Sequence, residues 1–201
     1  MTAQQAALLS EFNFVVAIDA SGSMGETDMP GGRSRWDYMQ ETLVAFARDL
    51  STIDSDGIDI VTFGGQNVIA TTNVTADAVK AVFASRQPRG STPLAQALTE
   101  CLKQAAKSDK KTFIMVFTDG VPDDKAAAAR VIVQQANRQE TDDECTILFV
   151  QVGRDPSATS YLRQLDDDLR GAKFDIVDAK TMDEAEAFPT TVDLICAAIQ
   201  D

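Results

Sequence analysis

Apolar runs separated by helical patterns constrain the fold of this chain more than any other feature. Three short runs are almost wholly apolar, and they lie at 12–18, 112–118 and 146–152. Strands that are covered on both faces have this composition. Between the runs, apolar residues recur at helical spacing, as Trp36, Met39 and Leu43 do within 34–51. The pattern predicts an α/β fold with a doubly wound, mostly parallel central sheet and helices on both faces.

Three further segments bring the predicted sheet to about six strands. Residues 58–63 (IDIVTF) and 67–72 (NVIATT) flank a glycine turn, which predicts a hairpin and one antiparallel edge strand. Residues 173–177 (KFDIV) are predicted as a last short strand. The remaining helices are expected over 76–85, after Pro93, over 123–139, over 157–169, and from Pro189 to the C-terminus.

Length and composition favour one domain. The chain has 201 residues, 44% of them apolar, which suits a single core. We expect one domain over 1–201, with 1–10 as an N-terminal extension. No apolar run approaches the roughly 18 residues of a membrane helix, and the N-terminus lacks a signal-peptide pattern. No cysteine belongs to a CxxC pair. We therefore expect buried, reduced thiols and a cytoplasmic protein without membrane partners.

Charge and the absence of histidine exclude several functions. The net charge is −13, from 18 basic and 31 acidic residues, and such a surface repels phosphate backbones. Nucleic acid is therefore not an expected partner. The chain contains no histidine, which excludes His-dependent triads and any metal site that needs imidazole.

Polar motifs follow two of the most apolar runs. DASGS (19–23) ends the first run, and TDG (118–120) ends another. Ligands of open α/β sheets bind beyond the carboxyl ends of the strands, and the most apolar strands are the central ones. We therefore expect Asp19 and Asp119 to be neighbours although 119 − 19 = 100 residues separate them. Because side chains two apart share a side of extended backbone, Asp19, Ser21 and Ser23 would converge.

The converging oxygens suggest a hard cation. Oxygen-only ligands suit Mg²⁺, Mn²⁺ or Ca²⁺, and Mg²⁺ takes about six of them. Candidate ligands are Asp19, Ser21, Ser23, Thr92 of GSTP (90–93) and Asp119. Each motif alone has a plainer explanation. The serines would stabilise a turn, Thr92 would cap a helix, and Asp119 with Gly120 would form a turn.

Taken together, DASGS, Ser91-Thr92-Pro93 and Thr118-Asp119-Gly120 resemble the von Willebrand factor type A domain with its metal-ion-dependent adhesion site. That site uses D-x-S-x-S, a threonine in a middle loop and an aspartate in T-D-G. The resemblance implies a Rossmann-like fold and direct metal binding by the Ser21 and Ser23 hydroxyls. Thr92 would bind the metal directly or through water. Asp19 and Asp119 would act mainly through water or hydrogen bonds to the serines.

The resemblance also implies a partner. A metal held mainly by neutral oxygens keeps most of its charge, and it attracts an Asp or Glu carboxylate of a partner protein. Mg²⁺ is the first expectation, with Mn²⁺ or Ca²⁺ as alternatives. Among the flanking residues, Arg33, Arg35 and Arg89 could meet an acidic partner at the rim. Glu26 and Asp28 could hold a second cation or remain solvated loop acids.

Two other functions stay open. The first is a Mg²⁺-dependent phosphohydrolase or phosphotransferase with Asp19 as nucleophile. Such enzymes typically need a second aspartate two residues later, where this chain has Ser21, and no phosphate-binding glycine motif is present. The second is a scaffold whose metal site is vestigial. The sequence favours a non-enzymatic, metal-dependent protein-interaction module in an intracellular assembly.

Overall fold

The central sheet has six strands in the order β3-β2-β1-β4-β5-β6, and all neighbours are parallel except β2 and β3. The computed structural model describes residues 1–52 and 57–200. The strands are β1 (Phe12–Asp19), β2 (Ile58–Gly64), β3 (Asn67–Val74), β4 (Lys111–Thr118), β5 (Cys145–Gln151) and β6 (Val177–Thr181). The predicted mostly parallel sheet with one antiparallel edge strand is confirmed.

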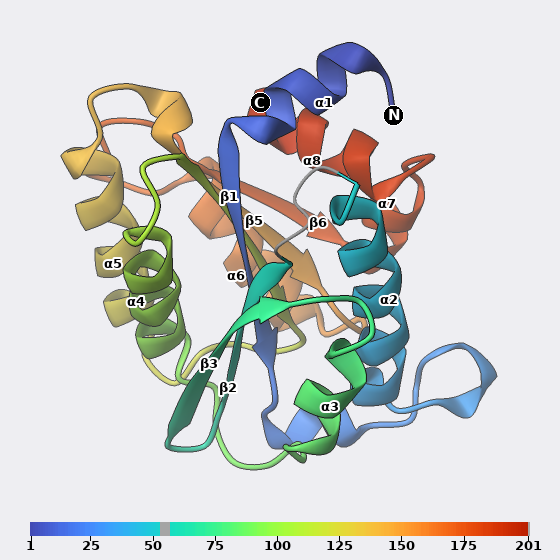
Figure 1. Cartoon of the computed structure of the whole chain (residues 1–201). Coiled ribbons are helices and arrows are strands. Elements are labelled where there is room, and N and C mark those ends of the chain that lie inside the picture. The colour runs from blue at the N-terminus through green and yellow to red at the C-terminus, as the bar shows by residue number, and fades with distance from the viewer. Residues whose placement is uncertain (53–56, 201) are drawn as a thin grey trace.

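Helices cover both faces of this sheet (Figure 1). The α-helices are α1 (Ala3–Ser10), α2 (Arg35–Leu50), α3 (Val79–Ala84), α4 (Leu94–Ala105), α5 (Lys125–Arg138), α6 (Pro156–Asp167), α7 (Met182–Glu186) and α8 (Thr191–Gln200). One apolar core lies between the sheet and α4, α5 and α6. The other lies between the opposite face and α1, α2, α3, α7 and α8. The doubly wound arrangement is therefore confirmed as well.

Strand β1 divides the two cores by simple alternation. Phe14, Val16 and Ile18 belong to the core beneath α2, whereas Val15 and Ala17 belong to the core beneath α4. None of these five side chains is more than 4% exposed. Burying a side chain of valine, isoleucine or phenylalanine contributes about 1.5–3 kcal/mol. Burial on both faces therefore fixes β1 at the centre and holds its last residue, Asp19, in place.

The chain reverses its direction across the sheet between β1 and β4. From β1 it continues outward to β2 and β3, and it then returns to β4 on the other side of β1 before reaching β5 and β6. Strand β1 starts beside α1 at the top of Figure 1 and ends at the bottom. Ile18 pairs with Phe117, so Asp19 and Thr118 end adjacent strands. This position is the switch point at which ligands bind in such sheets.

Several predicted boundaries differ from the structure by a few residues, as the helix predicted over 76–85 does, which spans Val79–Ala84. The last strand is Val177–Thr181 rather than 173–177, because continuous pairing with β5 begins at Val177, opposite Ile147, and the chain before it makes one backbone hydrogen bond to β5, from the Ile147 N–H to the Ile176 carbonyl. An edge strand has a single strand neighbour, so it tolerates a polar sequence that a search for apolar runs overlooks. The C-terminal helix begins at Thr191 rather than Pro189, because the Thr190 hydroxyl accepts a hydrogen bond from the Asp193 N–H (3.1 Å).

The N-terminal extension is helical. Residues Ala3–Ser10 form α1, whose first turn carries a reciprocal cap between Thr2 and Gln5. The Gln5 amide also donates to the Asp193 carboxylate of α8 (2.8 Å), and Leu9 is fully buried. These contacts attach α1 to the end of the sheet opposite to the carboxyl ends of its parallel strands (Figure 1).

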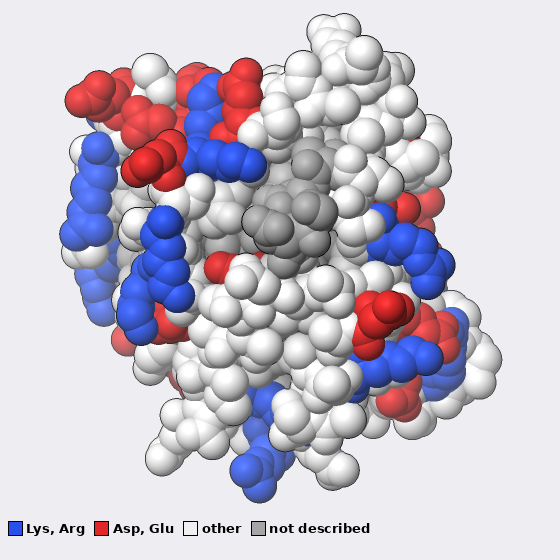
Figure 2. Space-filling view, in the orientation of Figure 1, with Lys and Arg blue, Asp and Glu red and all other residues white. Residues whose placement is uncertain are grey.

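Charged side chains are unevenly distributed over the surface (Figure 2). On the face of the molecule that Figure 2 shows, charged side chains gather around the margin, while the area over β3, a strand without charged residues, is largely uncharged.

Cys101, Cys145 and Cys196 are free and buried, as predicted. Within residues 1–52 and 57–200, none of the helices has the length and hydropathy that crossing a bilayer requires.

Candidate metal site

Asp19 is fully buried at the end of β1, and both of its carboxylate oxygens accept hydrogen bonds. The Ser21 N–H donates to Oδ1 (2.7 Å), and the Thr118 hydroxyl donates to Oδ2 (2.7 Å). Burial raises the pKa of Asp19 to about 7, and the nearby Asp119 carboxylate adds to the rise. The hydrogen bonds from Thr118 and Ser21 lower this pKa, because they favour the charged form.

The two serines of DASGS converge as predicted, although by a different route. A short 3₁₀ helix, η1 (Gly22–Gly25), turns the chain directly after Ser21, so the backbone does not stay extended. The Ser21 and Ser23 hydroxyl oxygens lie 3.2 Å apart, and the Ser23 hydroxyl donates to Oδ1 of Asp119 (2.8 Å). A hydroxyl that donates its proton in this way keeps its oxygen lone pairs for another partner.

Close backbone packing holds this turn in place. A Cβ at Gly64, the last residue of β2, would lie only 2.4 Å from the carbonyl oxygen of Ala20. Only glycine therefore lets the DASGS segment approach β2 this closely. The Gly22 N–H donates to the Gly90 carbonyl (3.0 Å), which joins the turn to the loop that carries Thr92.

Thr92 is buried on that loop and does not cap α4. The N-cap residue is Pro93, and no side chain caps this helix. The Thr92 backbone exchanges two hydrogen bonds with Asp123, both 3.0 Å long. In the described part of the chain its hydroxyl has no hydrogen-bond partner. The capping explanation is therefore wrong, and the hydroxyl is available to a ligand.

Asp119 follows β4 and is 2% exposed. Its Oδ1 accepts from the Ser23 hydroxyl, and its Oδ2 accepts from Nη1 of Arg35 (2.7 Å). Arg35 is the first residue of α2 and is only 7% exposed. The sequence-based expectation that Arg35 lies at the rim is therefore wrong: its guanidinium is an internal partner of the site.

Glu26 and Asp28 hold the other side of this guanidinium. Nε and Nη2 of Arg35 donate to the two carboxylate oxygens of Asp28 (2.9 and 2.6 Å), and Nη2 lies 2.9 Å from the Glu26 carboxylate. Hydrogen bonding to Arg35 lowers the pKa of Asp28. Hydrogen bonding to Asp28 in turn raises the pKa of Arg35. The two acids are partly exposed but ion-paired, a role that their sequence positions did not indicate.

The donor set fits a hard cation. Asp19 and Asp119 have both oxygens engaged by donors of the protein itself, while Ser21, Ser23 and Thr92 retain oxygen lone pairs. Oxygen donors of this kind suit Mg²⁺, Mn²⁺ or Ca²⁺. Among the described residues, no three or more Asp, Glu, Cys or His side chains form a group that could hold a metal. Any metal here would therefore depend on the hydroxyls.

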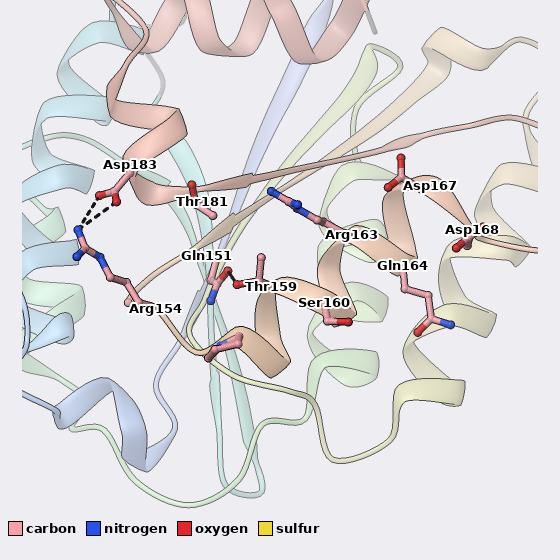
Figure 3. Close-up of a pocket in the computed structure, with 12 residues that line it drawn as sticks. Gln151, Arg154, Thr159, Ser160, Arg163, Gln164, Asp167, Asp168, Thr181 and Asp183 are labelled. Carbon is pink, nitrogen blue, oxygen red and sulfur yellow. Dashed lines mark hydrogen bonds and ion pairs between the residues drawn. The ribbon is translucent and has the colours of Figure 1, made fainter.

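A separate cavity of about 840 Å³ lies between α6 and the β6–α7 segment (Figure 3). Polar side chains line it, and two interactions bridge its wall: Thr159 donates to Gln151 (2.7 Å), and Arg154 pairs with Asp183 (3.1 Å). None of the five predicted metal residues lines this cavity. The hydroxyls and carboxylates at the end of β1 and β4 therefore remain the candidate site.

The fold and this edge site define a class of protein: a Rossmann-like α/β domain with hydroxyls and carboxylates gathered at the switch point of its sheet. The family model described as "von Willebrand factor type A domain" matches residues 14–121, which is more than half of the chain. The chain belongs to this family. The matched segment contains all five predicted metal residues.

Solved structures share the fold. A variant of the PilB minor pilin from Streptococcus sanguinis is 14% identical with a TM-score of 0.67, over 94% of this chain and 62% of the pilin. Manganese-loaded TRAP protein from Plasmodium vivax is 18% identical with a TM-score of 0.61, over 91% of this chain and 74% of that chain. The vWF domain of the type V pili tip protein Mfa5 from Porphyromonas gingivalis is 12% identical with a TM-score of 0.54, over 94% and 96%.

These identities are low, so the likeness concerns the fold alone. The chain spans 62% of the length of the pilin chain that it matches. No curated protein sequence is similar enough to this chain to count as a match. The family model thus identifies the domain family, the solved structures agree with it on the fold, and neither identifies a partner.

Proposed function

We propose that this domain is a non-enzymatic protein-interaction module whose binding depends on a divalent cation. Ser21, Ser23 and Thr92 would hold the cation through their hydroxyls, and Asp19 and Asp119 would act from behind through hydrogen bonds or water. A partner protein would add an Asp or Glu carboxylate. The observation that carries the proposal is the chain of hydrogen bonds that links Asp19 to Asp119 through the two serines.

The electrostatics of the residues support this role. Asp119 is already compensated by Arg35, and both oxygens of Asp19 accept hydrogen bonds from Ser21 and Thr118. Neither carboxylate is therefore free to cancel the charge of a bound cation fully. The cation supplies, when bound, an electrophilic point for a carboxylate from outside. Two opposite unit charges 4 Å apart attract by about 4 kcal/mol at an effective dielectric constant of about 20.

Mg²⁺ is the cation we propose first, with Mn²⁺ or Ca²⁺ as alternatives. The donor set consists of oxygens, which does not discriminate strongly among these three ions. The TRAP structure with a similar fold is manganese-loaded, which is a property of that protein. It supports the general expectation that such a fold accepts a divalent cation.

Thermal unfolding tests the metal site. We expect millimolar Mg²⁺ or Mn²⁺ to raise the melting temperature of the wild-type chain, because a ligand that binds only the folded state stabilises it. Asp19→Ala and Ser21→Ala should abolish this shift. Ser91→Ala is a matched control, because Ser91 adjoins Thr92 but is an exposed residue outside the proposed ligand set. Absence of any shift in the wild type would count against the site.

A pull-down tests the interaction itself. The tagged domain should capture a partner from cell extract in Mg²⁺ and lose it in chelator, and Ser21→Ala should lose it in both. An identical catch in Mg²⁺ and in chelator would contradict a metal-dependent interaction and favour a scaffold with a vestigial site.

We also propose a cytoplasmic location, which the three free buried cysteines support. Fractionation of cells that express the natural protein would test it.

The enzyme alternative makes a different prediction. A Mg²⁺-dependent phosphohydrolase with Asp19 as nucleophile would turn over a generic phosphoester, and Asp19→Asn would remove that activity. In this chain both oxygens of Asp19 accept hydrogen bonds within the protein, which leaves a poor nucleophile. We therefore expect no turnover with or without metal.

A further inference from the structure

Arg35 occupies a position at which a positive charge is unfavourable for a helix. It is the first residue of α2, and a positive charge near a helix N-terminus is opposed by the helix dipole. The N-terminus is already capped, since the Ser34 hydroxyl accepts from the Asp37 N–H (3.0 Å). The contacts of the guanidinium must therefore account for the position of Arg35.

Those contacts use all three nitrogens of the guanidinium. Nε and Nη2 donate to Asp28, Nη2 also pairs with Glu26, and Nη1 donates to Asp119 and weakly to the Ser23 carbonyl (3.5 Å). One side of the group is thus held by loop acids that are partly exposed. The other side holds Asp119, a residue of the proposed metal site, through a single nitrogen.

The fold also reserves space for this group. Gly153 follows β5 with a φ of +75°, and a Cβ there would lie 2.8 Å from Nε of Arg35 and 2.9 Å from its central carbon. Any larger residue would push the guanidinium away from its present position. The close approach of Gly153, the buried ion pair with Asp119 and the two loop acids together describe a built site for one cation.

We propose that Arg35 is a resident cation that competes with the divalent ion for the negative charge of Asp119 and thereby weakens metal binding. This inference rests on the proposed metal-binding function. Oδ2 of Asp119 is occupied by Nη1, so a divalent ion gains the full charge of Asp119 only when that contact loosens. Asp28 and Glu26 keep the guanidinium paired when it does. The positive charges of the Arg35 guanidinium and of the divalent ion also repel each other, which further weakens metal binding.

The test measures Mn²⁺ and Mg²⁺ affinity by isothermal titration calorimetry. Arg35→Gln should bind either ion about tenfold more tightly than the wild type, while its metal-free melting temperature falls because buried Asp119 loses its partner. Arg33→Gln is the matched control, since Arg33 is two residues earlier and pairs with Glu41 outside the site. Its metal affinity should equal that of the wild type.

A second variant separates competition from loss of folding. Gly153→Ala keeps the charge of Arg35 but displaces the guanidinium. Alanine is strained at this positive φ, so the melting temperature of the variant falls, but the folded variant too should bind metal more tightly. A wild type that binds metal, with folded Arg35→Gln and Gly153→Ala binding it equally or more weakly, overturns this inference and leaves the proposed function intact. If neither the wild type nor any variant binds metal, the proposed function fails and this inference fails with it.

Discussion

The hydrogen bond from Thr118 to Asp19 gives a prediction whose size depends on pH. Thr118→Val removes the hydroxyl that donates to Oδ2 of Asp19 (2.7 Å) and keeps the shape of the side chain. A hydrogen bond to a charged group contributes about 1.5–3 kcal/mol, whereas one to a neutral group contributes about 0.5–1.5 kcal/mol. The pKa of Asp19 is about 7, so the charge state of its carboxyl changes near neutrality.

The direction of this pH dependence follows from the thermodynamic linkage between proton binding and folding. In the folded state the pKa of Asp19 is raised from 3.8 to about 7, so its contribution to stability is lost as the pH rises through this range. Because the Thr118 bond lowers this pKa, the pKa in the Thr118→Val variant is higher. The variant therefore continues to lose stability above pH 7, where the wild type has stopped. The destabilisation should be small below pH 7 and should grow above it.

Thermal unfolding in chelator, followed by circular dichroism at about pH 6 and pH 9, measures this difference. In a chain of this size about 1 kcal/mol shifts the melting temperature by about 2–4 °C. We expect a loss of about 1–6 °C at the lower pH and about 3–12 °C at the higher one. Thr146→Val is the control, because buried Thr146 makes no side-chain hydrogen bond within the described residues. An equal loss at both pH values for Thr118→Val would show that the strength of this hydrogen bond does not depend on the charge of Asp19.

Three further predictions concern other parts of the fold. Burial and nearby Asp178 raise the pKa of Asp166 to about 6, so the wild type should lose stability between about pH 4 and 6. Asp166→Asn should remove that loss and raise the melting temperature at pH 7 by about 2–4 °C, after allowance for solvent screening. An unchanged or lower melting temperature at pH 7 would contradict this prediction. Gly64→Ala should cost at least about 1–3 kcal/mol in urea unfolding and abolish the metal-induced shift, whereas Gly25→Ala, with open space around it, should cost under about 0.5 kcal/mol. Arg154→Ala breaks only an exposed ion pair, so a stability loss above about 1 kcal/mol would be unexpected.

Much of the fold could be predicted because its central strands are almost wholly apolar. A strand that is buried on both faces consists almost wholly of apolar residues, and few other structures have this composition. Once such strands are recognised, the alternation of strands and helices along the chain follows. The prediction failed where burial is partial. Strand β6 lies at an edge and is polar, and α1 and α7 are too short to display a helical period. Such segments take their structure from tertiary contacts rather than from their own sequence pattern.

The candidate site was predictable to a similar extent. Asp19, Ser21, Ser23 and Asp119 form one hydrogen-bonded group, as their places at strand ends predicted, and Thr92 lies on a loop bonded to it. The position of Arg35 was missed. Arg35 lies 84 residues from Asp119 in the chain, and a single arginine at a helix start resembles any exposed one. The Gly153 that makes room for it carried no recognisable signal either.

The proposed metal site is tested most directly by anomalous diffraction from crystals grown with millimolar Mn²⁺. We expect one strong anomalous peak within coordination distance of the Ser21 and Ser23 hydroxyls, with Thr92 beside it and Asp19 and Asp119 behind. Well-ordered crystals in which these hydroxyls surround no such peak would contradict it.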